Sequence, residues 1–383
     1  MKIGFLVSHP TQFEVPFFRY VSGDRAHSLK VIYWDERRAR AIHDPEINRD
    51  INWGIDLWGG YSYVVMPPSR RASRLWREIS QQRFDLLVIN GYNHWTLIEA
   101  AIVAHFAGSA TALRIDSVSA DAFVGMKGRL KKWVLPALFG RYNAFLAVSS
   151  STRQYLIEQH VSSASIHYFT YAIDRAWFRA RSLLTCSERD AVKRRFGLCQ
   201  KKRLVLAISK LTPRETPWDL LHAVNSLEAN DVEVLIVGDG EDRERVIERA
   251  GGSRINVVCP GYVPYPDLPL LYGSADVFVH APRKEPYGVS VAEALACGIP
   301  VIASSTVGAG GDLIVHGHNG FVYEHGDSQQ LTLYLIRTLY AVDRNRCQET
   351  SNIVLRRWDY DATWRSILAC AQEMCVGRTS GKS

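Results

Sequence analysis

Short apolar runs recur along the whole chain, and this feature limits the possible fold more than any other. Each run is separated from the next by an amphipathic stretch. The runs occupy residues 2–8, 30–34, 62–66, 85–89, 111–114 and 144–148, and then 203–209, 232–238, 254–259, 276–280, 299–303 and 320–324. Strand-like runs that alternate with helix-like stretches are typical of parallel α/β folds.

The runs form two series, which indicates two domains. A chain of 383 residues is also about twice the length of an average domain. The sequence therefore predicts an α/β protein with two doubly wound, Rossmann-like domains, at 1–180 and 203–355. A polar, basic linker is expected at 181–202. Residues 356–383 are expected to hold a polar tail and a helix, for which a return to the N-terminal domain is one option.

Composition excludes several classes of protein. Hydrophobic residues make up 47% and charged residues 22%, which is ordinary for a soluble protein with full cores. The net charge of +7 is too small to imply a nucleic-acid partner. No apolar run approaches the roughly 18 residues of a membrane helix, and the N-terminal apolar run is too short for a signal peptide. Seven cysteines without a C-x-x-C pair suggest reduced thiols, so a cytoplasmic location is expected.

The segment EPYGVSVAEALACGIPV, residues 285–301, carries two glutamates beside a predicted helix start. Glu285 precedes a proline and is therefore excluded from the helix, while a helical pattern begins near Val289. Such a helix N-terminus offers free amides and partial positive charge, which suit a phosphate group. Glu285 and Glu293 would then flank a ligand site.

The same segment has a purely structural explanation. Ser290 and Glu293 fit a capping box, in which the glutamate accepts a hydrogen bond from the backbone amide of the capping residue. Spacing alone does not decide between helix capping and ligand binding for Glu293.

A second segment, SKLTPRETPWDLL at residues 209–221, places cations after a predicted strand. Lys210 and Arg214 lie in the loop that follows the strand, and two cations there could neutralise a diphosphate. Taken alone, a solvated basic loop explains the segment equally well.

No metal site is expected from the sequence. The twelve histidines form no H-E-x-x-H motif. Asp359 and Asp361 have the D-x-D spacing, but they lie in a helical stretch where a solvated or capping role is favoured.

Together these segments resemble glycosyltransferase family 4, whose members have the GT-B fold with two domains that face a central cleft. The resemblance covers most of the second half of the chain. It is carried by the two glutamates at 285 and 293, the run ALACGIPVIAS behind them, GAGGDLIVHGHNGFV at 308–322 and the basic loop of SKLTPRE. The opening SHPTQFEVPFFR, residues 8–19, looks like the first loop of one subgroup.

The resemblance implies roles for particular residues. Glu293 would bind the ribose hydroxyls of a UDP-sugar or GDP-sugar donor, and Glu285 would contact the sugar. Lys210 would contact the donor phosphates, with Arg214 as the second cation. The amides of Gly288, Val289 and Ser290 would also bind these phosphates. Lys210 and Glu285 are the expected catalytic residues.

Two positions depart from the family pattern. Glu215 stands where the family usually has a lysine, and Arg114 stands where many members have a histidine.

The expected activity is a retaining transfer of a sugar to a glycan or lipid-linked acceptor, as in cell-surface polysaccharide synthesis. Neither a Ser–His–Asp set nor closely paired acids indicate an enzymic nucleophile. A front-face reaction needs positioning and cations for the leaving group instead. Two alternatives remain, a related nucleotide-sugar epimerase and a non-catalytic nucleotide-sugar binder.

A basic segment at 126–139 could contact an anionic membrane from the inner face. No acid lies between Asp121 and Glu158, and Lys127, Arg129, Lys131 and Lys132 alternate with apolar residues that include Trp133, Leu135, Leu138 and Phe139. Basic helices with apolar partners can lie on such surfaces. A domain helix with a solvated basic face is the equal alternative.

Overall fold

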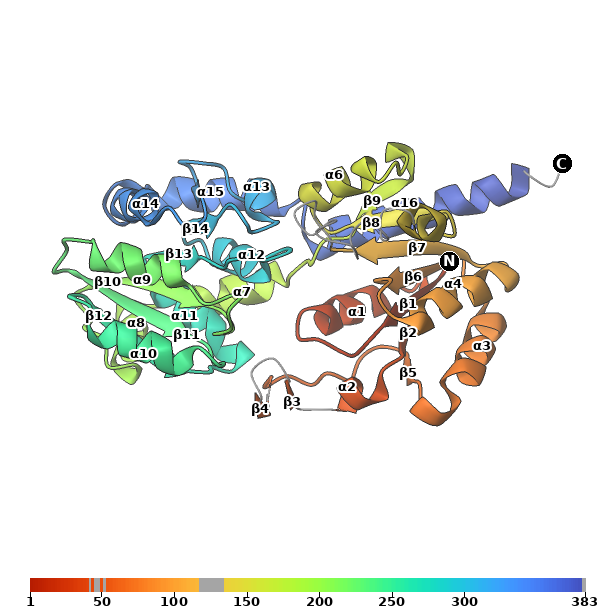
Figure 1. The fold of residues 1–383 in the computed structure, drawn as a ribbon, viewed down its shortest axis with the longest axis horizontal. Helices are drawn as coiled ribbons and strands as arrows, with labels where there is room; N and C mark the ends of the chain where they lie inside the picture. The colour runs from red at the N-terminus through yellow and green to blue at the C-terminus, as the bar shows by residue number, and fades with distance from the viewer. Residues whose placement is uncertain (41–42, 45–48, 51–52, 117–133, 381–383) are drawn as a thin grey trace. The chain divides into compact units, whose positions relative to one another are not determined.

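The computed structural model describes residues 1–40, 43–44, 49–50, 53–116 and 134–380 (Figure 1). The chain forms two compact units. Unit 1 comprises Met1–Ile42, Asp56–Ala172 and Tyr360–Ser383, and unit 2 comprises His43–Ile55 and Ile173–Asp359. Each series of predicted strands falls in one unit, which confirms the two-domain α/β prediction.

Unit 1 contains a seven-stranded parallel sheet with the order β5-β2-β1-β6-β7-β8-β9. The strands are β1 (Lys2–Val7), β2 (Ser28–Tyr33), β5 (Tyr63–Val65), β6 (Leu86–Asn90), β7 (Ala110–Ile115), β8 (Ala144–Ala147) and β9 (Ile166–Tyr168). The apolar runs predicted six of them, and β9 was missed because it has only three residues.

Helices cover both faces of this sheet because successive strand side chains point to opposite sides. Phe5 and Val7 pack with residues of α1 and α16, whereas Leu6 packs with residues of α3, α4 and α6. The helices of unit 1 are α1 (Glu14–Ser22), α2 (Glu36–Arg40), α3 (Arg71–Gln82), α4 (Trp95–Phe106), α6 (Ser150–Glu158) and α16 (Tyr360–Ser380).

The C-terminal helix α16 belongs to unit 1, and Figure 1 shows this blue helix beside β9. Ile367, Cys370 and Ala371 are completely buried in the cluster that also holds Phe5. The indole Nε1 of Trp364 donates a hydrogen bond to Asp24 Oδ2 at 2.9 Å.

Unit 2 contains a six-stranded parallel sheet with the order β12-β11-β10-β13-β14-β15. Its strands are β10 (Arg203–Ile208), β11 (Val232–Val237), β12 (Asn256–Gly261), β13 (Val277–His280), β14 (Val301–Ser304) and β15 (Gly320–Tyr323). All six were predicted from the apolar runs. A short antiparallel hairpin of β3 (His43–Asp44) and β4 (Arg49–Asp50), which was not predicted, is also part of this unit.

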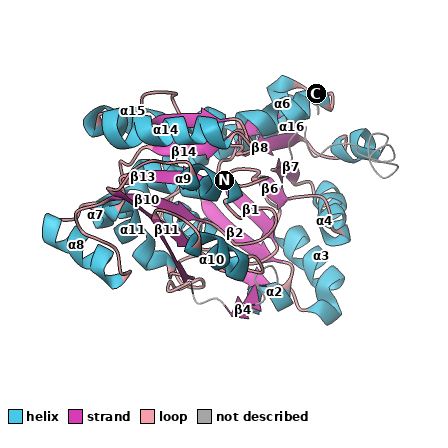
Figure 2. Ribbon diagram, turned by 60° about the vertical axis from the view of Figure 1, so that its left-hand side comes forward, coloured by secondary structure: helices cyan, strands magenta, loops and turns pink. Residues whose placement is uncertain are grey.

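Helices flank the strands of unit 2 as they do in unit 1 (Figure 2). They are α7 (Arg175–Ser182), α8 (Cys186–Arg195), α9 (Trp218–Asn225), α10 (Arg243–Gly251), α11 (Leu268–Ser274), α12 (Val289–Ala296), α13 (Gly310–Leu313), α14 (Ser328–Ala341) and α15 (Arg344–Leu355). Val205 and Ala207 of β10 pack with the cluster formed by α9 and α14.

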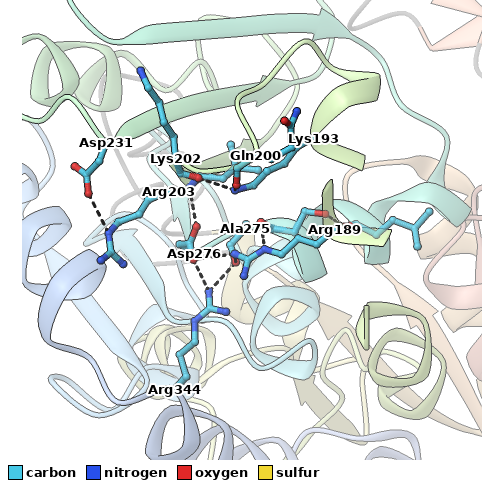
Figure 3. A network of polar contacts seen from close by, with 12 residues as sticks. Arg189, Lys193, Gln200, Lys202, Arg203, Asp231, Ala275, Asp276 and Arg344 are labelled. Carbon is cyan, nitrogen blue, oxygen red and sulfur yellow. Dashed lines mark hydrogen bonds and ion pairs between the residues drawn. The ribbon is translucent and has the colours of Figure 1, made fainter. Parts of the chain in front are cut away.

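Residues 181–202 lie within unit 2 and do not form the separate linker that was predicted. Helix α8 begins with a capping box on Thr185, and Figure 3 shows how two of its residues are anchored. Arg189 Nη2 donates to Asp276 Oδ1 at 2.8 Å, and Lys193 Nζ donates to the carbonyl oxygen of Lys202 at 2.6 Å. Arg344 of α15 also donates to Asp276, at 3.3 Å. This polar network attaches the basic segment to the sheet. The crossing from unit 1 to unit 2 that precedes this segment lies between Ala172 and Ile173, before the predicted linker begins.

The strand orders define one switch point in each sheet. The chain runs outward in opposite directions from β1 and β6 in unit 1, and from β10 and β13 in unit 2. Ligands of doubly wound sheets bind beyond the carboxyl ends of the strands at such points.

Candidate functional site

The loops that follow β10 and β13 meet at the switch point of unit 2. The carbonyl oxygen of Arg214 accepts hydrogen bonds from the backbone amides of Arg283, at 2.9 Å, and Lys284, at 3.2 Å. These bonds join the loop that carries Lys210 to the loop that carries Glu285. Two segments that the sequence singled out separately are therefore adjacent in the structure.

Glu285 holds the N-terminus of α12. Its Oε1 accepts hydrogen bonds from the amides of Tyr287 and Gly288, both at 3.1 Å. Gly288 has a φ of +91°, and a Cβ at this position would lie 2.6 Å from Val307 Cγ1, so only glycine fits. The predicted phosphate seat at Gly288, Val289 and Ser290 is thus a real helix N-terminus, but the Gly288 amide already binds Glu285.

Glu293 does not form the capping box that was one explanation of its position. The N-cap of α12 is Gly288, so Ser290 lies inside the helix and has no capping role. The Glu293 side chain is buried, and its Oε2 accepts a hydrogen bond from the hydroxyl of Tyr272 at 2.9 Å. Burial raises the pKa of Glu293 to about 7, although hydrogen bonds from Tyr272 and Tyr265 oppose this shift.

We expect the buried Glu293 carboxyl to make stability depend on pH. Its pKa rises from 4.5 to about 7 on folding, so the folded state keeps a proton that the unfolded state loses in this range. The stability of the wild type relative to Glu293→Gln should therefore fall as pH rises from 4.5 to 7, by at most about 3 kcal/mol, and stay constant above. Urea denaturation of both proteins at several pH values measures this difference, and a difference that does not change with pH would contradict the prediction.

Glu215, at the position of the usual family lysine, is buried and forms an ion pair with Arg214. Burial raises the pKa of Glu215, the nearby Glu285 raises it further, and the hydrogen bond from Arg214 opposes both effects. The predicted second cation, Arg214, is thus largely neutralised by its neighbour. Lys210 becomes the main candidate for contact with donor phosphates.

Sequence reasoning missed His280, the last residue of β13. Its side chain is buried, and its Nε2 has no hydrogen-bond partner. Burial lowers the pKa of His280 to about 4, so the ring is neutral near pH 7. Its position at a strand end beside the switch point was the signal that could have identified it.

Lys210 forms an ion pair that the sequence did not predict. Its Nζ lies 2.8 Å from Oδ2 of Asp44, on the hairpin of β3 and β4. The lysine side chain is 33% exposed and the aspartate side chain 14%. A carboxylate oxygen of Asp44 therefore already occupies the position beside Lys210 that would suit a phosphate oxygen.

Arg114 lies near the carboxyl end of β7 and is 1% exposed. Its guanidinium carbon lies 4.0 Å from the ring centre of Phe169 and 4.2 Å from that of Tyr171, and Nη1 forms an ion pair with Glu14. Nε and Nη2 of Arg114 are buried and have no hydrogen-bond partner. Arg114, at the position where many members of the family have a histidine, is therefore a buried cation. Its counter-ion is Glu14, from the SHPTQFEVPFFR segment.

A pocket of about 840 Å³ lies at the switch point of unit 1. Its walls come from segments at the carboxyl ends of β1, β2, β6 and β7, together with the start of α3. They include Ser8, Trp34, Arg71, His94 and Arg114.

The predicted membrane segment is only partly described. Lys127, Arg129, Lys131, Lys132 and Trp133 lie outside the described residues. Leu135 and Phe139 are 2% and 4% exposed and belong to the core of unit 1, so these two residues are not available to a membrane. The membrane contact stays a prediction that rests on the basic residues.

The helices in the described part of the chain are all too short or too polar to cross a bilayer. The same part of the chain contains no group of three or more His, Cys, Asp or Glu side chains that could hold a metal ion. The D-x-D acids form ion pairs instead, Asp359 with Arg175 and Asp361 with Arg365.

The comparisons with known proteins agree with this geometry. Residues 188–351 match the family model described as glycosyl transferases group 1. The GDP-mannose-dependent alpha-(1-6)-phosphatidylinositol monomannoside mannosyltransferase of Mycolicibacterium smegmatis is 27% identical over 247 residues, which cover 61% of this chain and 62% of that protein. The chain spans less than two thirds of the length of the curated relatives that it matches, with 36%, 62% and 42% for three of them.

Solved structures match over nearly the whole chain. A glycosyltransferase from Rickettsia africae has a TM-score of 0.78 at 16% identity and covers 98% of both chains. The Anabaena HepE structure in complex with UDP has a TM-score of 0.71 at 18% identity, over 99% of this chain and 100% of that chain. These matches confirm the predicted GT-B fold, and residues 188–351 are similar to the glycosyl transferases of group 1.

Proposed function

We propose that this protein is a glycosyltransferase that moves a sugar from a nucleotide-sugar donor, bound by unit 2, to a glycan or lipid-linked acceptor with retention of anomeric configuration. The observation that supports it most is the convergence of Lys210 and Glu285 at the switch point of unit 2, where the backbone of Arg214 joins their loops. A cation binds the negative charge of a nucleotide diphosphate. A carboxylate stabilises the positive charge that develops on the sugar.

In this proposal Lys210 binds the diphosphate of the donor. The donor phosphate replaces Asp44 as the partner of Lys210, because both present an oxygen anion to the same ammonium group. Lys210 then stabilises the negative charge that grows on the departing phosphate, together with the N-terminal end of α12.

Glu285 and Glu293 contact the rest of the donor. Glu285 is fixed by two backbone amides and faces the positive charge that develops on the anomeric carbon. Glu293 binds the ribose hydroxyls, and the hydroxyl of Tyr272 orients its carboxyl group.

The transfer step needs no enzymic nucleophile. The bond between the anomeric carbon and the phosphate oxygen breaks, and the acceptor oxygen bonds to the same face of that carbon. The proton of the acceptor hydroxyl passes to the departing phosphate oxygen, so atoms and charge balance. The protein contributes positioning and charge stabilisation.

A thermal-shift panel of UDP-sugars and GDP-sugars tests donor binding. A donor at 100 times its dissociation constant should stabilise the folded chain by about 2.7 kcal/mol. For the active donor, NMR of the product should show an α-linkage from an α-linked donor, and EDTA should leave the rate unchanged. A panel in which no nucleotide sugar stabilises the chain contradicts the donor assignment, and a β-linked product contradicts retention.

One observation favours a second candidate, a nucleotide-sugar binder without transfer activity. Glu215 neutralises Arg214 beside the donor site, which weakens the stabilisation of a leaving phosphate. Measuring donor consumption with and without acceptors separates the two candidates, because a binder would be stabilised by the donor but would not consume it.

A further inference from the structure

The pocket of unit 1 has charged walls that the proposed donor chemistry does not use. It lies beyond the carboxyl ends of β1, β2, β6 and β7, and every residue that lines it belongs to unit 1. The following inference rests on the proposed function, because it names the class of acceptor that this pocket would take.

One wall of the pocket is aromatic. The rings of Trp34 and His94 are stacked, with centres 4.3 Å apart and planes 26° apart. His94 Nδ1 accepts a hydrogen bond from the amide of Thr96 at 3.1 Å, so Nε2 carries the proton of the neutral ring. Flat rings with polar edges suit a small polar ligand such as a sugar.

Arginines dominate the charge of the pocket. Four arginines line it, against two aspartates, Asp35 and Asp116. Two of the arginines have acidic partners. Arg38 Nε lies 3.7 Å from Asp35 Oδ2, and Arg114 forms an ion pair with Glu14. Within the part of the chain that the structure describes, no carboxylate lies within ion-pair distance of the other two, Arg37 and Arg71.

Arg71 carries one of these two positive charges, and α3 and Trp34 define its position in the pocket. It is the first residue of α3, and its guanidinium carbon lies 5.7 Å from the centre of the Trp34 ring. Its Nε is buried without a hydrogen-bond partner, and so are Nε and Nη2 of Arg114, which is almost completely buried. Buried donors without partners are rare because each costs free energy, which a bound acceptor group would offset.

We propose that the acceptor of the transfer carries an anionic oxygen group, a carboxylate or a phosphate, and that Arg71 binds this group beside the stacked Trp34 and His94. A planar guanidinium binds either group through two parallel hydrogen bonds. Arg37 adds positive charge at the same pocket, and Arg114 adds buried guanidinium donors that have no hydrogen-bond partner. Neutral sugars of the same size leave the Arg71 donors without an acceptor of equal strength.

Binding of matched ligand pairs to the full-length chain tests this proposal without any donor. Calorimetric titrations would compare methyl glucuronide with methyl glucoside, and glucose 6-phosphate with glucose. We expect at least one charged member to bind roughly tenfold or more tightly than its neutral partner, and the preference to weaken as salt is raised. A carboxylate-only preference indicates a uronic acid, and a phosphate-only preference indicates a phosphorylated or diphosphate-linked acceptor.

Variants locate the binding group. Arg71→Gln should abolish the preference, Arg71→Lys should keep part of it, and Arg74→Gln, an exposed arginine of the same helix outside the pocket, should leave it intact. Equal binding of charged and neutral ligands overturns the proposal. So does a preference that survives in Arg71→Gln, provided that its melting temperature shows a folded protein.

The failure of this inference is distinguishable from the failure of the proposed function. If nucleotide sugars are consumed and the sugar reaches neutral acceptors as fast as charged ones, the acceptor inference is wrong and the transferase assignment stands. If charged ligands bind through Arg71 but no nucleotide sugar stabilises the chain, the anion site stands and the donor assignment is wrong.

Discussion

Replacing Lys210 with glutamine should slow sugar transfer by about 10²–10³-fold, the usual effect of removing one group that stabilises transition-state charge. Arg214 is already paired with Glu215, so it offers little compensation for the lost cation. Stability should change little, because the lysine side chain is one-third exposed and glutamine can still donate a hydrogen bond to Asp44. Initial rates at saturating donor, with a melting temperature for each protein, measure both effects.

Two companion variants separate the role of Lys210 from a general effect of charge. Lys201→Gln removes an exposed lysine near the opposite end of β10 and should leave the rate unchanged. Asp44→Asn removes the carboxylate that competes with the donor for Lys210, so donor affinity should rise. A Lys210→Gln enzyme with a normal rate would contradict the leaving-group role, and unchanged donor affinity in Asp44→Asn would show that the hairpin does not compete with the donor.

Most of the fold was predictable because its main determinant is local. A buried parallel strand appears in the sequence as a short apolar run, independently of the rest of the chain. Each of the twelve runs therefore corresponds to a strand of the structure. Strand β9 escaped because three residues, Ile166–Tyr168, carry too little pattern. Residues 181–202 were misassigned because the polar contacts of Arg189 and Lys193 with distant residues attach α8 to unit 2 despite its basic composition.

From the sequence, only those site residues could be predicted that directly follow a predicted strand. Lys210 and Glu285 follow β10 and β13, and parallel strands bring their carboxyl ends to one edge. The capping explanation for Glu293 was wrong because Gly288, with its positive φ, starts the helix before Ser290. The same strand-end rule would have pointed to Trp34 and His94, which were overlooked because no family motif covers them.

Partners from distant parts of the sequence could not be predicted. Arg114 depends on Glu14, 100 residues earlier, and Lys210 pairs with Asp44 on a two-residue strand. Nothing in the local pattern of either segment indicates its partner. Such pairs result from tertiary packing, which brings together residues that no short-range rule relates.

Glu285 offers the second large effect, because its carboxylate has both a structural and a proposed electrostatic role. Glu285→Gln keeps an oxygen that can accept the hydrogen bonds now made by the amides of Tyr287 and Gly288. The start of α12 should therefore be preserved, and the melting temperature should remain close to that of the wild type. The negative charge that would face the developing positive charge of the donor sugar is lost.

We expect Glu285→Gln to lower the transfer rate at saturating donor by about 10²-fold. Affinity for the free nucleoside diphosphate should be unchanged, since that product lacks the sugar that Glu285 contacts. Glu248→Gln, an exposed glutamate of α10, serves as the matched control and should transfer at the wild-type rate. Rates and calorimetric titrations with UDP or GDP on the three proteins give the comparison. If Glu285→Gln transfers sugar normally, the carboxylate only caps α12, and the charge that stabilises the donor sugar must come from another residue of the site.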